Sequence, residues 1–154
     1  MKAKTAPMPA ILAFLLAVLP APAIAVDSEP PSPASAEHAA GRKAIEARNW
    51  NAAIQSLTSA AQRDSGNADI HNLLGYAYRN AGQLEPALKH YQRALQLEPR
   101  HLGAHEYIGE AYLMADNFAK AEEHLAALKR YCTMVCEERD DLAGKIAAYR
   151  ARRK

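Results

Sequence analysis

Cys132 and Cys136 are the residues of this chain whose spacing most directly suggests chemistry, and they are its only cysteines. In an oxidising compartment we expect the two thiols to join as a disulfide that acts as a structural staple. Redox activity, metal ligation and unpaired thiols are the alternatives. In an unbroken helix the two Cα atoms would lie ~6.2 Å apart, near the upper end for a disulfide, so a bent junction is expected.

Histidines are the second candidates for chemistry. His101 and His105 stand at positions i and i+4, which places both imidazoles on one helix face, where they could clamp a metal ion. This spacing alone is weak evidence, and no metal site is predicted. Three further histidines are scattered and are expected at the surface: His38, His90 and His124.

Recognisable catalytic motifs are absent from the sequence. It has no glycine-rich phosphate loop, no Gly-x-Ser-x-Gly, no His-Glu-x-x-His and no Cys-x-x-Cys. Serine, histidine and aspartate all occur, but a catalytic triad is defined by geometry, which their order does not predict. We therefore expect a protein that is not an enzyme and needs no cofactor.

A regular sequence period organises the elements that must position these side chains. One stretch carries Leu74-Gly75, Tyr78, Ala87 and Tyr91, followed by Ala94 and Pro99. The same frame recurs downstream as Ile108-Gly109, Tyr112, Ala121 and Leu125, and in degenerate form upstream as Ala40-Gly41, Ala44, Ala53 and Leu57. This order resembles the tetratricopeptide repeat, a helix-turn-helix unit of about 34 residues.

The resemblance implies an all-α solenoid of about three units followed by a capping helix. The units are expected at about 34–67, 68–101 and 102–135, with the capping helix at about 137–150, so that 35–154 form one domain. His71 and His105 occupy the same position in successive units, where the family usually has Trp, which implies packing within the helix interface. The segment from Leu102 to Tyr149, with its cysteine pair, looks like the C-terminal part of small secreted bacterial proteins of this family.

The apolar positions follow a helical period from about Ser35 onward, and no strand is expected. Gly75 and Gly109 are predicted at close crossings between the two helices of a unit. Asn67 and Asn117 are placed as N-caps. The predicted helices are Ser35–Arg48, Asn51–Arg63, Ala68–Ala81, Glu85–Leu97, His101–Ala115, Phe118–Tyr131 and Glu137–Arg150.

Residues 1–25 have the pattern of a secretory signal. Lys2 and Lys4 precede an apolar run, and Ala23-Ile24-Ala25 supplies the small residues that a signal peptidase reads. We expect residues 1–25 to be removed, residues 26–34 to form a disordered proline-rich linker, and the protein to be periplasmic. No other segment is expected to cross a membrane.

The charge balance argues against nucleic acid as a partner. Loss of Lys2 and Lys4 leaves 17 basic and 17 acidic residues, so the mature chain is formally neutral. The expected partner is instead a protein or peptide, and the sequence gives no indication of an oligomeric state.

In solenoids of this kind, a concave groove lined by the first helix of each unit is the usual binding surface. From this resemblance, His38 and Arg42 of the first unit should face the groove. Glu106 and Glu110 make it a poor match for a partner's terminal carboxylate, so a peptide carrying Lys, Arg or amide groups fits better. The groove residues expected from the second and third units are Asp69, Asn72, Tyr76, Arg79, Asn80, Glu106, Glu110, Leu113 and Met114.

These features favour a periplasmic protein-interaction module that acts as an adaptor or assembly factor. The competing interpretation is a small redox or metal-handling protein that works through Cys132, Cys136 and the histidines.

Overall fold

The structure is a computed structural model that describes residues 33–153. The predicted signal peptide, 1–25, and all but the end of the predicted linker lie outside the described residues. Between 33 and 153 the chain forms helices and no strand, which confirms the all-α prediction. The helices are α1 (Pro33–Glu46), α2 (Trp50–Arg63), α3 (Ala68–Asn80), α4 (Leu84–Leu97), α5 (Leu102–Met114), α6 (Phe118–Tyr131) and α7 (Glu137–Arg152).

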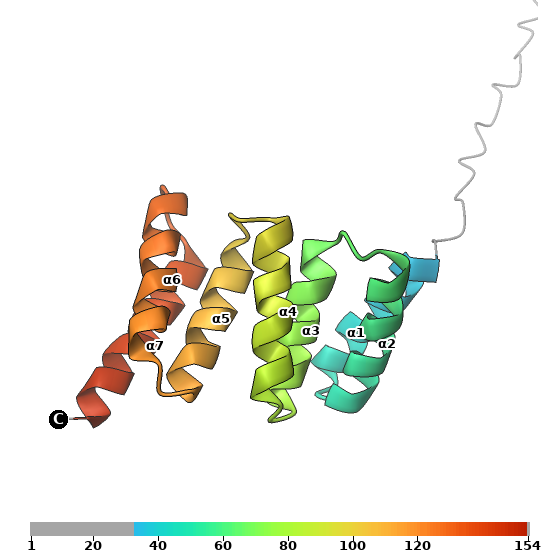
Figure 1. Cartoon of the computed structure of the whole chain (residues 1–154), viewed down its shortest axis with the longest axis horizontal. Helices are drawn as coiled ribbons and strands as arrows, with labels where there is room; N and C mark the ends of the chain where they lie inside the picture. The colour runs from blue at the N-terminus through green and yellow to red at the C-terminus, as the bar shows by residue number, and fades with distance from the viewer. Residues whose placement is uncertain (1–32, 154) are drawn as a thin grey trace, which may run out of the picture. The chain divides into compact units, whose positions relative to one another are not determined.

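The helices form three pairs that stack in sequence order, α1 with α2, α3 with α4 and α5 with α6 (Figure 1). The seventh helix, α7, packs against both α5 and α6. This arrangement confirms the predicted helix-turn-helix units and the final capping helix. None of the helices in the described range is both long and apolar enough to cross a membrane.

The turn inside each unit contains one residue in the left-handed backbone region. These residues are Arg48, Gly82 and Asp116, with φ of 54°, 77° and 57°, and they are spaced by the repeat period. After each of them the next backbone N–H bonds back to a carbonyl five residues earlier. Only Gly82 adopts this conformation without steric cost. The three repeat units therefore share one turn geometry, although Arg48 and Asp116 are residue types that disfavour the left-handed conformation.

Asparagine side chains cap several helices, as the sequence predicts. Asn67 Oδ1 accepts the backbone N–H of Ile70 at 3.2 Å, and Asn117 Oδ1 accepts that of Lys120 at 3.2 Å. α1 begins at Pro33, inside the segment expected to be linker, since proline suits the first turn of a helix.

Glycines on the first helices allow close approach, but not always to the predicted neighbour. A Cβ at Gly75 would lie 2.6 Å from the ring of Tyr91 on the second helix of the same unit. A Cβ at Gly109 would instead lie 2.6 Å from Leu142 Cδ2 of α7. The expectation that Gly109 serves a crossing within its own unit is therefore corrected: the atoms nearest to it belong to the capping helix.

The interior divides into two hydrophobic clusters. One joins α2 and α3 through residues such as Leu57, Ile70 and Leu74, and the other extends from α4 to α7 through residues such as Tyr91, Ile108 and Leu142. Tyr78 is packed against both clusters. The core thus follows the stack of helices, as expected where each unit contacts its neighbours.

Candidate functional site

A groove of about 360 Å³ runs across the first helices of the units and the start of α7. It takes residues from α1, α3, α5 and α7. The lining residues are Arg42, Asp69, Asn72, Leu73, Gly103, Glu106, Tyr107, Glu137, Glu138 and Asp141. Four segments far apart in sequence therefore contribute to one surface.

The groove is strongly acidic. Five carboxylates line it and Arg42 is its one cation among the lining residues. Asp69, Glu137 and Asp141 are exposed, so their charges are available to a partner. Asp69 also lies 3.1 Å from His101 Nε2. A surface with this charge attracts basic groups and repels carboxylates.

Asn72 lies at the base of the groove with a hydrogen-bonding atom unused. Its residue is only 6% exposed, and its Oδ1 is buried without a hydrogen-bond partner. Gly103 leaves space beside it, since a Cβ there would lie 3.3 Å from Asn72 Nδ2. A buried unsatisfied amide oxygen is costly in free energy.

Glu106 is more deeply buried than an exposed groove residue should be. Its residue is 6% exposed, and burial, together with the neighbouring charge of Glu110, raises its pKa to about 7. Lys145 Nζ of α7 lies 3.5 Å from its Oε1. The helix that follows the repeats thus covers part of the surface the sequence assigned to a partner.

Glu110 is occupied by partners within the chain. It forms ion pairs with Arg79 of α3 and Lys145 of α7. Burial alone would raise the pKa of Glu110, but its bonds to Lys145 and Arg79 outweigh burial and lower it. Arg79 also lies beside two neighbouring aromatic rings, 5.3 Å from the centroid of Tyr76 and 5.4 Å from that of Tyr107. This network links α3, α5 and α7.

The remaining predicted groove residues lie in other places. Leu113 and Met114 line a depression between α5 and α7 with Glu110 and Lys145. Asn80 lies near the turn between α1 and α2 and donates to the backbone carbonyl of Tyr76 at 2.8 Å. The structure therefore brings Arg42, Asp69, Asn72 and Glu106 together in the groove, whereas Asn80, Leu113 and Met114 do not line it.

The sequence analysis did not predict three of the groove carboxylates, which are Glu137, Glu138 and Asp141 of α7. The repeat period contained the signal that locates them. Glu137 follows Gly103 by one full period, and Asp141 follows Tyr107 by the same interval. If the repeat period is extended beyond the third unit, α7 takes the position of the first helix of a fourth unit.

Cys132 and Cys136 form a disulfide in the junction between α6 and α7, with their Cα atoms 5.9 Å apart. The chain between them is not helical, so the junction is bent as expected. Cys136 is buried and precedes Glu137, the first residue of α7. The disulfide therefore constrains the helix end that carries the groove carboxylates.

The histidines do not gather around the cysteines or form the clamp that their spacing allowed. In the described part of the chain, no three His, Cys, Asp or Glu side chains are placed to hold a metal ion. His90 and His124, expected at the surface, are half-buried and lie against His71 and His105. The correction follows from the helix pairing, which brings a position on each second helix beside the histidine of its first helix.

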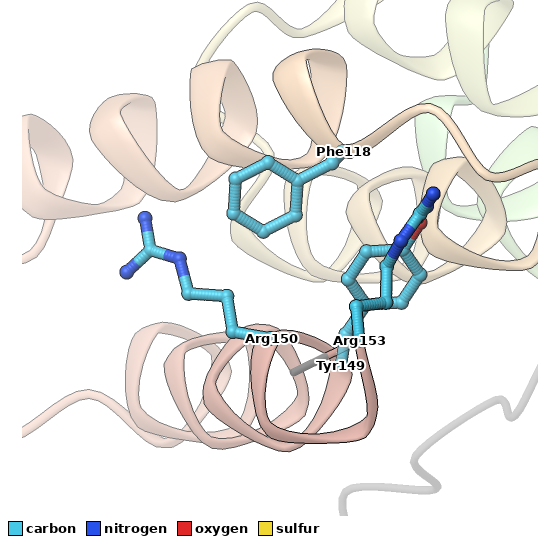
Figure 2. A pocket seen from close by; sticks show the side chains of 4 residues that line it. All are labelled: Phe118, Tyr149, Arg150 and Arg153. Atoms are coloured by element: carbon cyan, nitrogen blue, oxygen red, sulfur yellow. The ribbon is translucent and has the colours of Figure 1, made fainter.

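A separate cleft of about 330 Å³ lies between α6 and α7. Figure 2 shows the rings of Phe118 and Tyr149 with Arg150 and Arg153 beside them. The ring centroids are 5.6 Å apart, and Arg150 lies 4.9 Å from that of Phe118. Both guanidinium groups are paired with carboxylates of the same chain, Glu122 and Asp116 respectively. Their charge is thus largely satisfied internally.

The fold and groove define a tetratricopeptide repeat solenoid. Residues 68–101 match the family described as Tetratricopeptide repeat. Among solved structures, the chain is similar to the TPR2B domain of yeast Sti1 in its complex with pHsp70, with a TM-score of 0.72 and 15% identity over 79% of this chain and 98% of that one. It is also similar to the Yersinia enterocolitica type III secretion translocator chaperone SycD, with a TM-score of 0.71 and 13% identity over 77% and 84%.

Sequence relatives match over shorter stretches. The chain is 31% identical over 75 residues to the human protein O-mannosyl-transferase TMTC3, which covers 49% of this chain and 8% of that protein. It is 31% identical over 67 residues to the uncharacterized protein ycf37 of Guillardia theta, covering 44% of this chain and 38% of that protein. The chain thus spans a small part of the length of these relatives.

Proposed function

We propose that this protein is a periplasmic interaction module whose groove binds a basic polypeptide segment, and that it acts as an adaptor or assembly factor without catalysing a reaction. The observation that carries this proposal is the convergence of five carboxylates in one groove, where Asp69, Glu137 and Asp141 are exposed. Lys or Arg side chains would pair with the exposed carboxylates.

Support also comes from what the structural neighbours do. The similar domain of yeast Sti1 was solved in a complex with pHsp70, and SycD is a chaperone of secretion translocators. Polypeptide partners of this kind suit a groove formed by several helices. The acidic lining of this chain indicates the opposite charge preference to a site for a partner's carboxylate.

The test is capture of a partner from periplasmic extract with purified mature protein, followed by charge reversal in the groove. Glu137→Lys/Asp141→Lys should lose the captured partner, because both side chains are exposed and line the groove. Glu106 and Glu110 are unsuitable for this test, since their burial and ion pairs mean that reversal would also destabilise the fold.

The matched control is Glu46→Lys/Glu123→Lys. These two carboxylates are exposed and lie outside the groove lining, so the change in net charge is the same. Capture that is retained by this control and lost by the groove variant supports the proposal. Equal capture by all three proteins would exclude the acidic groove as the binding surface.

The periplasmic assignment has its own test. If Ala23-Ile24-Ala25 is the cleavage motif, the exported protein begins at Val26. N-terminal sequencing of protein recovered from the periplasm checks this. A mature chain that still begins at Met1 would contradict the assignment.

A further inference from the structure

Two pairs of histidines lie in equivalent positions of the second and third units. His71 Nδ1 is 3.2 Å from His90 Nδ1, and His105 Nδ1 is 2.9 Å from His124 Nδ1. Both members of the second pair follow those of the first by one repeat period. In the first unit the corresponding residues are Glu37 and Ser56, so the pair is absent there.

The nitrogens of each pair point almost directly at one another. The ring centroids are 5.5 Å apart in the His71–His90 pair and 5.2 Å apart in the His105–His124 pair. In both pairs the distance between the ring centroids is longer than the Nδ1···Nδ1 distance by about twice the radius of an imidazole ring. This difference is expected when both nitrogens lie on the line between the two centroids. The two nitrogens of each pair therefore face one point between the rings.

Backbone and aromatic contacts fix the orientation of the rings. His71 Nε2 lies 3.3 Å from the carbonyl oxygen of Ser65, and His105 Nε2 lies 3.0 Å from that of Pro99. A ring that donates Nε2–H to a carbonyl presents Nδ1 as a bare acceptor, the arrangement usual for metal-binding histidines. Tyr78 stacks on His90 and Tyr112 on His124, with interplanar angles of 8° and 15°.

We propose that each histidine pair is a two-coordinate site for a soft monovalent cation of the Cu(I) or Ag(I) class. Two collinear imidazole nitrogens complete the coordination of such an ion, whereas Zn²⁺ needs about four ligands. The described residues offer no third His, Cys, Asp or Glu ligand at either pair. Two metal–nitrogen bonds of about 2 Å each would require a pair to open by roughly 1 Å.

The surrounding charges favour a monovalent ion over a divalent one. Arg93 and Asp64 lie near His71, Arg130 and His101 lie near His105, and Lys120 lies near His124. These neighbours are mainly cationic, so a second positive charge on the ion would be repelled more strongly. Burial keeps the imidazoles neutral by lowering their pKa values, so at neutral pH no additional proton competes with the ion.

Binding leaves protons and electrons in balance. In the free pair, His90 donates its Nδ1–H to His71, and the same holds for His124 and His105. When the ion binds, that proton moves to Nε2 of the same ring. In the described part of the chain, Nε2 of His90 and Nε2 of His124 make no hydrogen bond, so both can take up a proton. The ion arrives in its monovalent state and keeps it. Access to the second pair is open, because His124 lines a surface depression of about 300 Å³.

The experiment titrates the purified, disulfide-bonded protein with silver nitrate in chloride-free buffer, using calorimetry and the ¹⁵N chemical shifts of the imidazoles. We expect two Ag(I) per chain and shifts at Nδ1 of both pairs. His90→Phe and His124→Phe should each retain one equivalent, since phenylalanine keeps the aromatic stack and removes a ligand. Zn²⁺ should bind at least tenfold more weakly.

The matched control is His101→Asn, which removes an imidazole outside the pairs and keeps an N-cap acceptor for α5. It should retain two equivalents, as should Met114→Leu/Met134→Leu, which removes the exposed thioethers. Unshifted Nδ1 resonances in the parent protein would overturn the proposal even if a variant fails to fold. So would unchanged stoichiometry in the folded phenylalanine variants, or Zn²⁺ binding as tight as that of Ag(I).

Discussion

Leu142 of the capping helix lies directly over Gly109, so closely that a Cβ at that glycine would be 2.6 Å from Leu142 Cδ2. Leu142 is fully buried there. This contact seats α7 on α5 and thereby brings Glu137 and Asp141 into the groove. The first prediction concerns the space that Gly109 leaves for it.

Gly109→Ala should lower the free energy of unfolding by about 2 kcal/mol, because the added methyl group forces Leu142 out of its place. Gly144→Ala on α7 is the matched control. A Cβ at Gly144 meets no atom within 4 Å, so the same change should stabilise by about 1 kcal/mol through helix propensity. Thermal unfolding followed by circular dichroism measures both. Similar shifts in Tm would contradict the seating of α7.

The turn inside each unit gives a second prediction. Arg48 adopts a left-handed conformation that glycine adopts at Gly82. Arg48→Gly should therefore stabilise the protein by about 1 kcal/mol, and Gly82→Ala should destabilise it by a similar amount. The space around Gly82 is open, so steric overlap does not contribute. Urea unfolding provides the two values, and shifts of the same sign would argue against the shared geometry.

The histidine pairs make stability depend on acid. Burial, followed by the charges of His105 and Lys120, lowers the pKa of His124 to about 4, below the ~6.5 of an unfolded histidine. The unfolded chain therefore takes up the proton first, so the stability present above pH ~6.5 is lost as the pH falls towards 4. Urea midpoints between pH 4 and 8 should show this loss, and His124→Phe should reduce it.

The carboxyl of Glu106 makes stability depend on pH in the opposite direction from His124. Its folded pKa of about 7 exceeds the ~4.3 of an unfolded glutamate, so the folded state holds the proton more tightly. Its contribution is favourable at low pH and is lost as the pH rises through 7. Glu106→Gln should thus be more stable than the parent at pH 8 by on the order of 1 kcal/mol. An advantage of the same size at pH 4 would show that ionisation is not the cause.

The disulfide gives a further prediction. Cys132→Ser/Cys136→Ser should reduce the free energy of unfolding by about 2 kcal/mol, the entropic value for so short a loop. Hydrogen exchange should then quicken mainly in α7, because the junction next to Cys136 loses its constraint. The amides of α1 and α2 are the internal control and should exchange as in the parent. Equal acceleration in every helix would contradict a local role.

The sequence predicted the repeats well because their packing leaves a periodic signal. Gly75, Tyr78 and Ala87 recur at a fixed interval since each unit repeats the same helix crossing. The helix ends were predicted within about two residues, because N-caps such as Asn67 and Asn117 depend only on residues close to them in the sequence.

The candidate site was harder to predict because it depends on contacts between distant segments. Glutamates such as Glu106 and Glu110 are usually exposed on a helix. Only the ion pairs with Lys145 show that α7 covers them. His90 and His124 look like isolated surface residues until the helices pair. Charge and burial at these positions are properties of the packed units rather than of any one helix.

Tyr78 is the aromatic residue that packs against both hydrophobic clusters, and this position couples the unfolding of one cluster to that of the other. In a linear stack, cooperativity is transmitted only from one neighbour to the next. Tyr78 shares this coupling with other contacts between α3 and the helices that follow it, such as the Tyr91 ring against Gly75 and the Arg79–Glu110 ion pair. We expect these contacts together to make the two clusters unfold in one transition.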